Sequence, residues 1–269
     1  MIEYDESVDF SKIGSCILAY GPTNSGKTMS ALTCEDPILH INTEGKDARL
    51  VHNQVDHKKQ IKYIRFENYD DTKNTINNML SEAGKGTFKF KTIFYDGLTF
   101  GQQEVKREIE QSRREVREDD KSMRGIVDYF RFEKPDWGAM GAAMTSIASL
   151  LMKFTGFGVT VICTALEDNN YPKWGQGVRI GPALTGQDFS KLLPGFFHFI
   201  GYVVRPFGFD DSMSNIYPLI SFNTASDPNG NDYIARSSST TLSKAGPAPL
   251  DWTKILKVIR GTTKKEASK

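Results

Sequence analysis

The sequence predicts an α/β fold: a mainly parallel sheet with helices on both faces, followed by an antiparallel hairpin near the C-terminus. Three observations support this prediction. Short apolar runs bounded by turn residues alternate with segments of helical pattern. A glycine-rich stretch, GPTNSGKT, stands between the first apolar run and the first expected helix. With 269 residues, 39% of them hydrophobic, the chain is long enough to bury a large core.

Six strands are expected before the hairpin. Each is a short apolar or β-branched run, and together they cover residues 15–20, 38–42, 61–66, 91–96, 158–166 and 196–205. Residues 61–66 alternate in polarity, which is typical of an edge strand, whereas GVTVICTAL is rich in β-branched and apolar residues and suits a central one. The turn signal DPNGND predicts hairpin strands within residues 216–237.

Five helices are expected between and after these strands. They run from Gly26 to about Cys34, from a cap at Asp70 or Asp71 through Leu80 to an end at Gly84, over 102–121, over about 138–154, and from Asp251 to about Ile259. The helix over 102–121 interleaves charges of both signs, so a solvated face is the simplest interpretation. Residues 167–195 show no clear period, and loops of such length are usually functional or mobile.

Composition narrows the possible classes of protein. The formal net charge of +1 argues against a basic surface overall, so any nucleic-acid contact must come from local patches. Cys16, Cys34 and Cys163 form no metal-binding pair and are expected to be buried thiols of a reducing compartment. We find neither a signal peptide nor a membrane span, and therefore expect a cytoplasmic protein without membrane partners.

We expect one main domain with short appendages. An N-terminal arm covers residues 1–14, the domain covers 15–260, and a basic, disordered tail covers 261–269. Short charged tails are commonly no more than solubilising, and non-specific contact of the basic segment beyond Thr253 with a phosphate backbone is the alternative.

The stretch GPTNSGKT carries the strongest chemical signal. It fits the pattern G-x-x-x-x-G-K-[ST] and lies after a strand and before a helix, where phosphate-binding loops occur. The backbone N–H groups of such a loop wrap the phosphates, Lys27 reaches the β- and γ-phosphates, and the Thr28 hydroxyl ligates magnesium. The nucleotide-binding residues are then Gly21, Pro22, Thr23, Asn24, Ser25, Gly26, Lys27, Thr28 and Met29. ATP and Mg²⁺ are the expected ligands.

Two carboxylates are expected to face this loop. Asp96 ends the strand IFYD, and a carboxylate there lies at the ligand-binding edge of an α/β sheet, where it can hold magnesium. Many nucleotide hydrolases place a catalytic glutamate directly after this aspartate, but here the next residue is Gly97. Glu44 follows the strand ILHIN at the same edge and is our candidate for the base that orients water. A solvated loop glutamate is the alternative interpretation.

These features resemble the RecA family, which also places its catalytic glutamate after the strand that follows the phosphate-loop helix. The segments DWGAMG, VICTALED, GPALTG and LPGFFHFIGYVVR resemble the phage-type, core-only RecA-like ATPases, including single-strand annealing recombinases of bacteriophages. The resemblance implies a RecA-like P-loop ATPase core with strand order 61–66, 38–42, 91–96, 158–164, 15–20, 196–204. It also implies the host cytoplasm as the location.

The resemblance carries further expectations about partners and site residues. It implies DNA-stimulated ATP hydrolysis on single-stranded DNA in recombination, annealing or replication, in a filament or ring, with a single-strand binding protein as a further partner. Thr164 is the nearest match to the polar residue that reads the γ-phosphate. Arg236 matches a basic residue that reaches a neighbouring subunit's phosphates, although a surface arginine is an equal alternative. Leu166 replaces a histidine that is frequent in the relatives.

Two segments, 121–137 and 168–191, mix basic, aromatic and glycine residues as single-strand binding grooves do. The candidate DNA contacts are Arg131, Lys173, Trp174 and Arg179. Both segments also contain acidic residues, so a role in an interface or in local folding stays open.

Three other functions share the phosphate loop. A small-molecule kinase would need an arginine-rich lid, and residues 168–191 offer only Arg179. A helicase or packaging motor is disfavoured because no glutamate follows Asp96. A nucleotide-gated DNA-binding or assembly scaffold with little turnover remains the non-enzymatic alternative.

Overall fold

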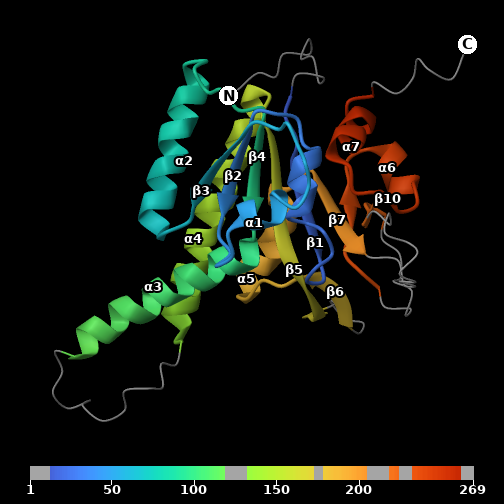
Figure 1. Ribbon diagram of the computed structural model, residues 1–269. Coiled ribbons are helices and arrows are strands. Elements are labelled where there is room, and N and C mark those ends of the chain that lie inside the picture. The colour runs from blue at the N-terminus through green and yellow to red at the C-terminus, as the bar shows by residue number, and fades with distance from the viewer. Residues whose placement is uncertain (1–12, 119–131, 173–177, 205–217, 224–231, 262–269) are drawn as a thin grey trace, which may run out of the picture.

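A computed structural model describes residues 13–118, 132–172, 178–204, 218–223 and 232–261. Six parallel strands form the centre of one sheet, in the order β3 (Ile61–Arg65), β2 (Ile38–Asn42), β4 (Thr92–Asp96), β5 (Thr160–Pro172), β1 (Cys16–Gly21) and β7 (Phe199–Val204). This order confirms the RecA-like arrangement predicted from the sequence. Because all six strands run the same way, their carboxyl ends meet at one edge, the lower edge in Figure 1.

Antiparallel strands extend the sheet beyond β7. The strand β8 (Leu219–Ser221) pairs with the end of β7, β9 (Arg236–Ser237) pairs with its beginning, and β10 (Ala248–Pro249) pairs with β8. The antiparallel extension was predicted, but its expected hairpin pairing is wrong for the described residues. The two strands lie in line along the same free edge of β7 and pair with it instead of with each other.

The central strand β5 is longer than expected. It continues past Leu166 to Pro172 and pairs with β6 (Val178–Pro182) in an antiparallel hairpin that projects beyond the edge of the sheet. The prediction of irregular structure from residue 167 onward is therefore wrong at its start. Asn, Pro and Gly in this stretch lower its strand propensity, but pairing between its two halves overrides that preference.

Helices cover both faces of the sheet (Figure 1). One face carries α2 (Tyr69–Gly84), α3 (Leu98–Glu118), α4 (Lys134–Lys153) and α5 (Gln187–Leu192). The 3-10 helix η4 (Phe154–Phe157) follows α4, and the 3-10 helix η5 (Leu193–Phe196) follows α5. The other face carries the 3-10 helix η2 (Met29–Thr33), α6 (Thr240–Lys244) and α7 (Trp252–Ile259). Neighbouring residues of β1 point to opposite faces, so Leu18 joins the first core and Ile17 the second. A short helix, α1 (Ala48–His52), connects β2 with β3.

Local capping explains where several helices differ from prediction. Asn68, not Asp70 or Asp71, caps α2, because its side chain accepts a hydrogen bond from the backbone N–H of Asp71. The helix α4 begins at Lys134 because Glu133 and Asp136 form a capping box. In each case a polar residue ahead of the apolar pattern satisfies backbone donors that the pattern itself does not reveal.

The helix after the glycine-rich turn is shorter than predicted. Instead of an α-helix from Gly26 to Cys34, the chain makes a 3-10 helix over Met29–Thr33. Its far end is held by α7, where the backbone N–H of Trp252 donates to the Thr33 hydroxyl and the Trp252 indole donates to the Ser30 hydroxyl. Hydrogen bonds thus connect η2 with α7 near the C-terminal end of the described residues.

The three cysteines are free and buried, as predicted. Burial raises the pKa of the Cys16 thiol to about 12 and raises the pKa values of Cys34 and Cys163 as well, so all three are held as thiols. Among the described helices none is both long and apolar enough to cross a bilayer. Most of the expected arm and tail, residues 1–12 and 262–269, lies outside the described residues.

Candidate functional site

The phosphate-loop sequence follows β1 at the carboxyl edge of the sheet. Gly26 has a φ of +86°, and a Cβ on Gly21 would lie 2.3 Å from the carbonyl oxygen of Val203, so both glycines are required by geometry. Asn24 also has a positive φ, of 58°, which asparagine tolerates better than most residues. The loop therefore adopts a backbone path that only this pattern of residues accommodates readily.

Lys27 lies almost buried within this loop. Its ammonium group donates to the carbonyl oxygens of Gly21 and Pro22 and to the Ser25 hydroxyl. Burial lowers the pKa of Lys27 to about 8, although the charges of Asp96, Glu44 and Glu167 oppose the shift. Three carboxylates are therefore close enough to Lys27 to influence its protonation.

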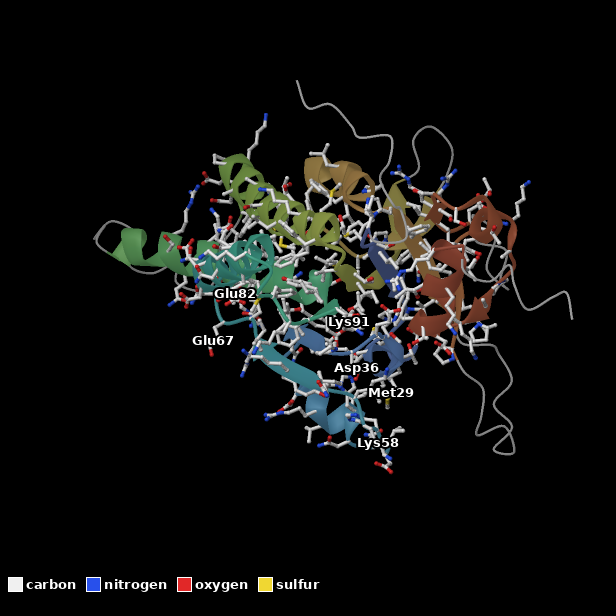
Figure 2. The ribbon with its side chains drawn as sticks, turned by 90° about the horizontal axis from the view of Figure 1, so that it is seen from above. Met29, Asp36, Lys58, Glu67, Glu82 and Lys91 are labelled. Carbon is white, nitrogen blue, oxygen red and sulfur yellow. The ribbon has the colours of Figure 1, made fainter. Side chains whose placement is uncertain are left out.

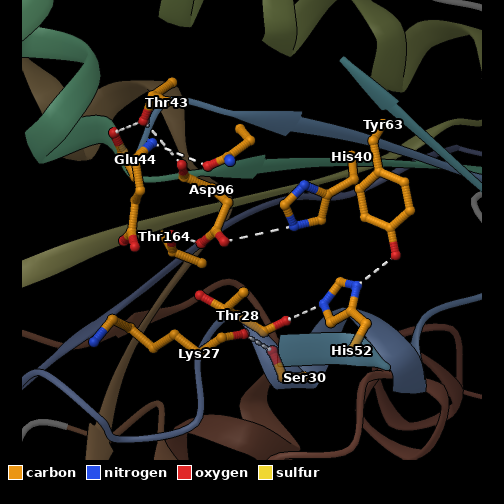
Figure 3. A network of polar contacts seen from close by, with 12 residues as sticks. Lys27, Thr28, Ser30, His40, Thr43, Glu44, His52, Tyr63, Asp96 and Thr164 are labelled. Carbon is orange, nitrogen blue, oxygen red and sulfur yellow. Dashed lines mark hydrogen bonds and ion pairs between the residues drawn. The ribbon is translucent and has the colours of Figure 1, made fainter. Parts of the chain in front are cut away.

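Asp96 is buried at the end of β4 and holds its charge through several partners. The Thr164 hydroxyl donates to its Oδ1 at 2.7 Å, and Nε2 of His40 lies 3.5 Å from its Oδ2. Burial alone would raise the pKa of Asp96, but His40, Thr164 and the Thr28 hydroxyl outweigh it, so the pKa lies below the ordinary value. The carboxylate is thus ionised and faces the phosphate loop (Figure 3).

Residues 43 and 44 lie directly beside Asp96 and Gly97. The Thr43 backbone N–H donates to the Asp96 carbonyl at 3.1 Å, and the Thr43 hydroxyl donates to the carbonyl oxygens of both Asp96 and Gly97. Gly97 has a φ of +105°, and a Cβ there would lie 2.8 Å from the Thr43 hydroxyl and 3.2 Å from Cγ of Glu44. Position 97 has no room for a glutamate, because residues 43 and 44 already occupy that space.

Glu44 points from this corner toward the phosphate loop, alongside Asp96 (Figure 3). Its backbone N–H donates to the side chain of Asn42, which fixes the turn after β2. Burial and the charge of Asp96 raise the pKa of Glu44, while Lys27 and Lys46 act in the opposite direction. The structure therefore brings together the two carboxylates that the sequence places on separate strands.

The donor set suits magnesium bound with a nucleotide. Thr28 and Asp96 offer hydroxyl and carboxylate oxygens, which are the hard ligands that Mg²⁺ prefers. The described residues contain no group of three or more His, Cys, Asp or Glu that would form an all-protein metal cage. Two protein ligands supplemented by phosphate oxygens are the usual arrangement for Mg²⁺, so these residues fit the ion.

Thr164, the candidate reader of the γ-phosphate, contacts Asp96. It lies within β5 rather than at its end, it is 1% exposed, and its hydroxyl is bound to Asp96. The strand continues past Thr164 to Pro172, and the role of Thr164 in reading the γ-phosphate stays a prediction. In this arrangement Thr164 orients the Asp96 carboxylate.

Arg236 is not brought to the phosphate loop of its own chain. It pairs with Ile200 near the start of β7, at the opposite end of that strand from the loop, and its guanidinium donates to the Pro194 carbonyl.

Of the four candidate DNA contacts, only Arg179 lies among the described residues. It is on β6, and its Nε is buried without a hydrogen-bond partner among the described residues. Arg131, Lys173 and Trp174 lie outside the described residues.

Several residues around the site were missed by sequence reasoning. Asp96 is contacted by Thr43 and His40, and Thr28 is contacted by His52. The charge of Glu167 acts to raise the pKa of Lys27, and its carboxylate accepts a hydrogen bond from the Tyr202 hydroxyl. One signal was available, because a histidine within the apolar run ILHIN is unusual in a strand buried on both faces. The contacts of His52 depend on the path of the chain between β2 and β3, which no pattern revealed.

Comparisons with known proteins identify the family of the chain. The profile of the AAA domain family matches residues 13–214, which span the phosphate loop, Glu44 and Asp96. A comparison with curated proteins gives no significant match. Among solved structures, a KaiC-like protein from the hyperthermophilic archaeon Pyrococcus horikoshii matches with 13% identity and a TM-score of 0.39, covering 78% of each chain.

The corner between Gly97 and residues 43–44 can be tested by Gly97→Ala. The added Cβ meets Thr43 and Glu44 and must adopt a positive φ, so we expect a loss of about 1–3 kcal/mol in the free energy of unfolding. Gly45→Ala is the matched control, since a Cβ there meets nothing within 4 Å. Urea unfolding of both variants gives the comparison, and equal stability would contradict the proposed crowding.

Proposed function

The chain belongs to the AAA domain family, and from the site described above we propose that it binds ATP with Mg²⁺ and hydrolyses it. One observation carries this proposal. Glu44 follows β2 by two residues and Asp96 ends the neighbouring strand β4, and both face Lys27 and Thr28 across the carboxyl edge of the sheet (Figure 3). Crevices at this edge are where α/β sheets bind nucleotides.

Each group has a role that follows from its place. The loop between Gly21 and Thr28 supplies backbone N–H groups to the phosphates, and Lys27 exchanges its carbonyl partners for phosphate oxygens. Thr28 and Asp96 would hold Mg²⁺. When bound, the ion would supply positive charge against the charge that develops on the phosphates. Thr164 and His40 keep Asp96 ionised and oriented.

Glu44 is the group that acts on water. Its raised pKa makes its carboxylate a better proton acceptor than an ordinary glutamate, and it lies beside the magnesium carboxylate without sharing its hydrogen bonds. We assign it to orient the attacking water and to accept its proton. Thr43 and Glu44 occupy the space that a side chain at position 97 would need, so the catalytic carboxylate comes from the turn after β2 instead of following Asp96.

We further propose that the protein acts on single-stranded DNA through the β5–β6 hairpin. The strand β5 contacts Asp96 through Thr164 and then continues into this hairpin. The same strand therefore connects the proposed nucleotide site with the hairpin. The hairpin pairing begins at Glu167, and the backbone N–H of the preceding residue, Leu166, donates to the Thr99 hydroxyl. Thr99 is on α3 and lies two residues after Gly97 in the sequence. Arg179 on β6 supports the proposal through its chemistry, because a planar guanidinium suits the recognition of phosphate.

Assembly into a homo-oligomer is part of the proposal. Arg236 lies too far along β7 to serve the phosphate loop of its own chain, so a role at the phosphates requires a second copy. A phage role in recombination, annealing or replication rests on the sequence resemblance alone.

Glu44→Gln tests the assignment of the base. The amide cannot accept the proton of water, so we expect kcat for ATP hydrolysis to fall by about 100-fold or more while nucleotide binding is retained. Glu67→Gln is a close control. Glu67 lies two residues past the end of β3, as Glu44 lies two residues past the end of the neighbouring strand β2, but its side chain is exposed (Figure 2). Phosphate release measures turnover, and unchanged turnover in Glu44→Gln would refute the assignment. Binding without turnover in the unmodified chain, even with DNA, would favour the scaffold.

Arg179→Ala tests the DNA surface. We expect wild-type turnover to rise with single-stranded oligonucleotides, and we expect the variant to bind them more weakly at every sequence. Loss of one phosphate contact reduces the slope of log K against log salt by about one. Arg107→Ala is the control, because Arg107 is exposed on α3 and paired with Glu104. Fluorescence anisotropy at several salt concentrations measures both. Equal slopes for the two variants would place DNA elsewhere.

A further inference from the structure

His52 makes two hydrogen bonds that define its chemical form. Its Nε2 lies 2.9 Å from the carbonyl oxygen of Thr28, and its Nδ1 lies 2.7 Å from the Tyr63 hydroxyl. A carbonyl oxygen only accepts, so Nε2 carries the proton and Nδ1 of the neutral ring accepts from Tyr63. The ring is completely buried and therefore has no water to replace either partner.

The Thr28 carbonyl belongs to the first turn after the phosphate loop. It also accepts a hydrogen bond from the Ala31 N–H at 3.2 Å, which leaves one lone pair for His52. Because η2 is a short 3-10 helix, Thr28 has few helical bonds to fix it. The hydrogen bond from His52 therefore restrains the residue whose hydroxyl is assigned to magnesium.

A second histidine connects His52 with the opposite magnesium ligand. The ring of His40 packs edge-on against His52, with centroids 5.3 Å apart, and lies stacked on Phe94. Its Nε2 is the atom that lies 3.5 Å from Asp96. Tyr63 packs against both histidines. One buried cluster, made of His40, His52 and Tyr63, thus contacts Thr28 on one side and Asp96 on the other (Figure 3).

We propose that His52 is a positioning residue that holds Thr28 at the correct distance from Asp96 for magnesium-dependent nucleotide binding. This inference rests on the proposed function, because it assigns Mg²⁺ to the same two oxygens. His52 comes from α1 and Tyr63 from β3, neither of which supplies a group to the nucleotide. The segment between β2 and β3 therefore contributes to the site, although it is separated in sequence from the phosphate loop.

Two amide substitutions separate the two hydrogen bonds of the ring. In His52→Gln the amide N–H₂ reaches the position of Nε2 and can still donate to Thr28. In His52→Asn the shorter amide reaches only the position of Nδ1 and loses the Thr28 contact. Each replaces the ring by a polar amide, so a general effect of removing a buried aromatic ring appears in both.

The measurement is the affinity for ADP in the full chain, once with excess Mg²⁺ and once with EDTA. For wild type we expect Mg²⁺ to tighten binding. For His52→Asn we expect this tightening to fall about tenfold, the value of one hydrogen bond, with little change in EDTA. For His52→Gln we expect it to stay within about threefold of wild type, since the donor is retained.

Several outcomes would overturn the inference. It fails if His52→Asn keeps the full effect of Mg²⁺, if His52→Gln loses as much as His52→Asn, or if both variants weaken equally in EDTA, as a merely structural role predicts. If wild type binds ADP without any effect of Mg²⁺, the magnesium assignment in the proposed function fails too. If only the variants deviate from expectation, the proposed function stands and the role of His52 does not.

A second readout needs no altered chain and applies even if a variant does not fold. In protein labelled with ¹⁵N-histidine, we expect the His52 resonances to show the Nε2–H tautomer. They should shift when Mg²⁺ is added to the ADP-bound protein, because Thr28 is then drawn toward the ion. The opposite tautomer, or resonances indifferent to Mg²⁺, would contradict the inference.

Discussion

The close approach of Thr43 to Asp96 and Gly97 is the contact on which the site depends. Through its backbone N–H and its hydroxyl, Thr43 donates to the carbonyl oxygens of these two residues, and this joins the ends of β2 and β4 beyond their regular pairing. Buried backbone carbonyls require such partners, so the two turns cannot separate without loss. The contact leaves space at position 97 only for glycine and directs Glu44 to the side of Asp96.

The surroundings of Asp96 follow from the same corner. Once its backbone is held, the carboxylate receives the Thr164 hydroxyl from β5 on one side and faces His40 of β2 on the other. A buried carboxylate is stable as an anion only when its oxygens have such partners. Three adjacent strands thus contribute to one charged group, and the phosphate loop on β1 lies across from it. The aromatic cluster beneath extends this support to Thr28.

Much of this arrangement could be predicted from the sequence, for identifiable reasons. Strand order followed from apolar runs and from resemblance, and the shared edge followed from parallel pairing, which places Asp96 and Glu44 together. Other features depend on contacts distant in sequence. The 3-10 form of η2 is accompanied by hydrogen bonds from Trp252, some 220 residues away, and the length of β5 depends on pairing with β6. The roles of His40 and His52 depend on ring packing, which carries no periodic signal.

The most direct test of the central claim is a crystal structure with Mg²⁺, ADP and a planar aluminium fluoride group in the place of the γ-phosphate. We predict that the Glu44 carboxylate lies about 2.6–3.2 Å from the water in line with that group, while Asp96 and Thr28 face the ion. The account is contradicted if Glu44 turns away from this water and another residue holds it, with the contacts between Thr43, Asp96 and Gly97 still intact.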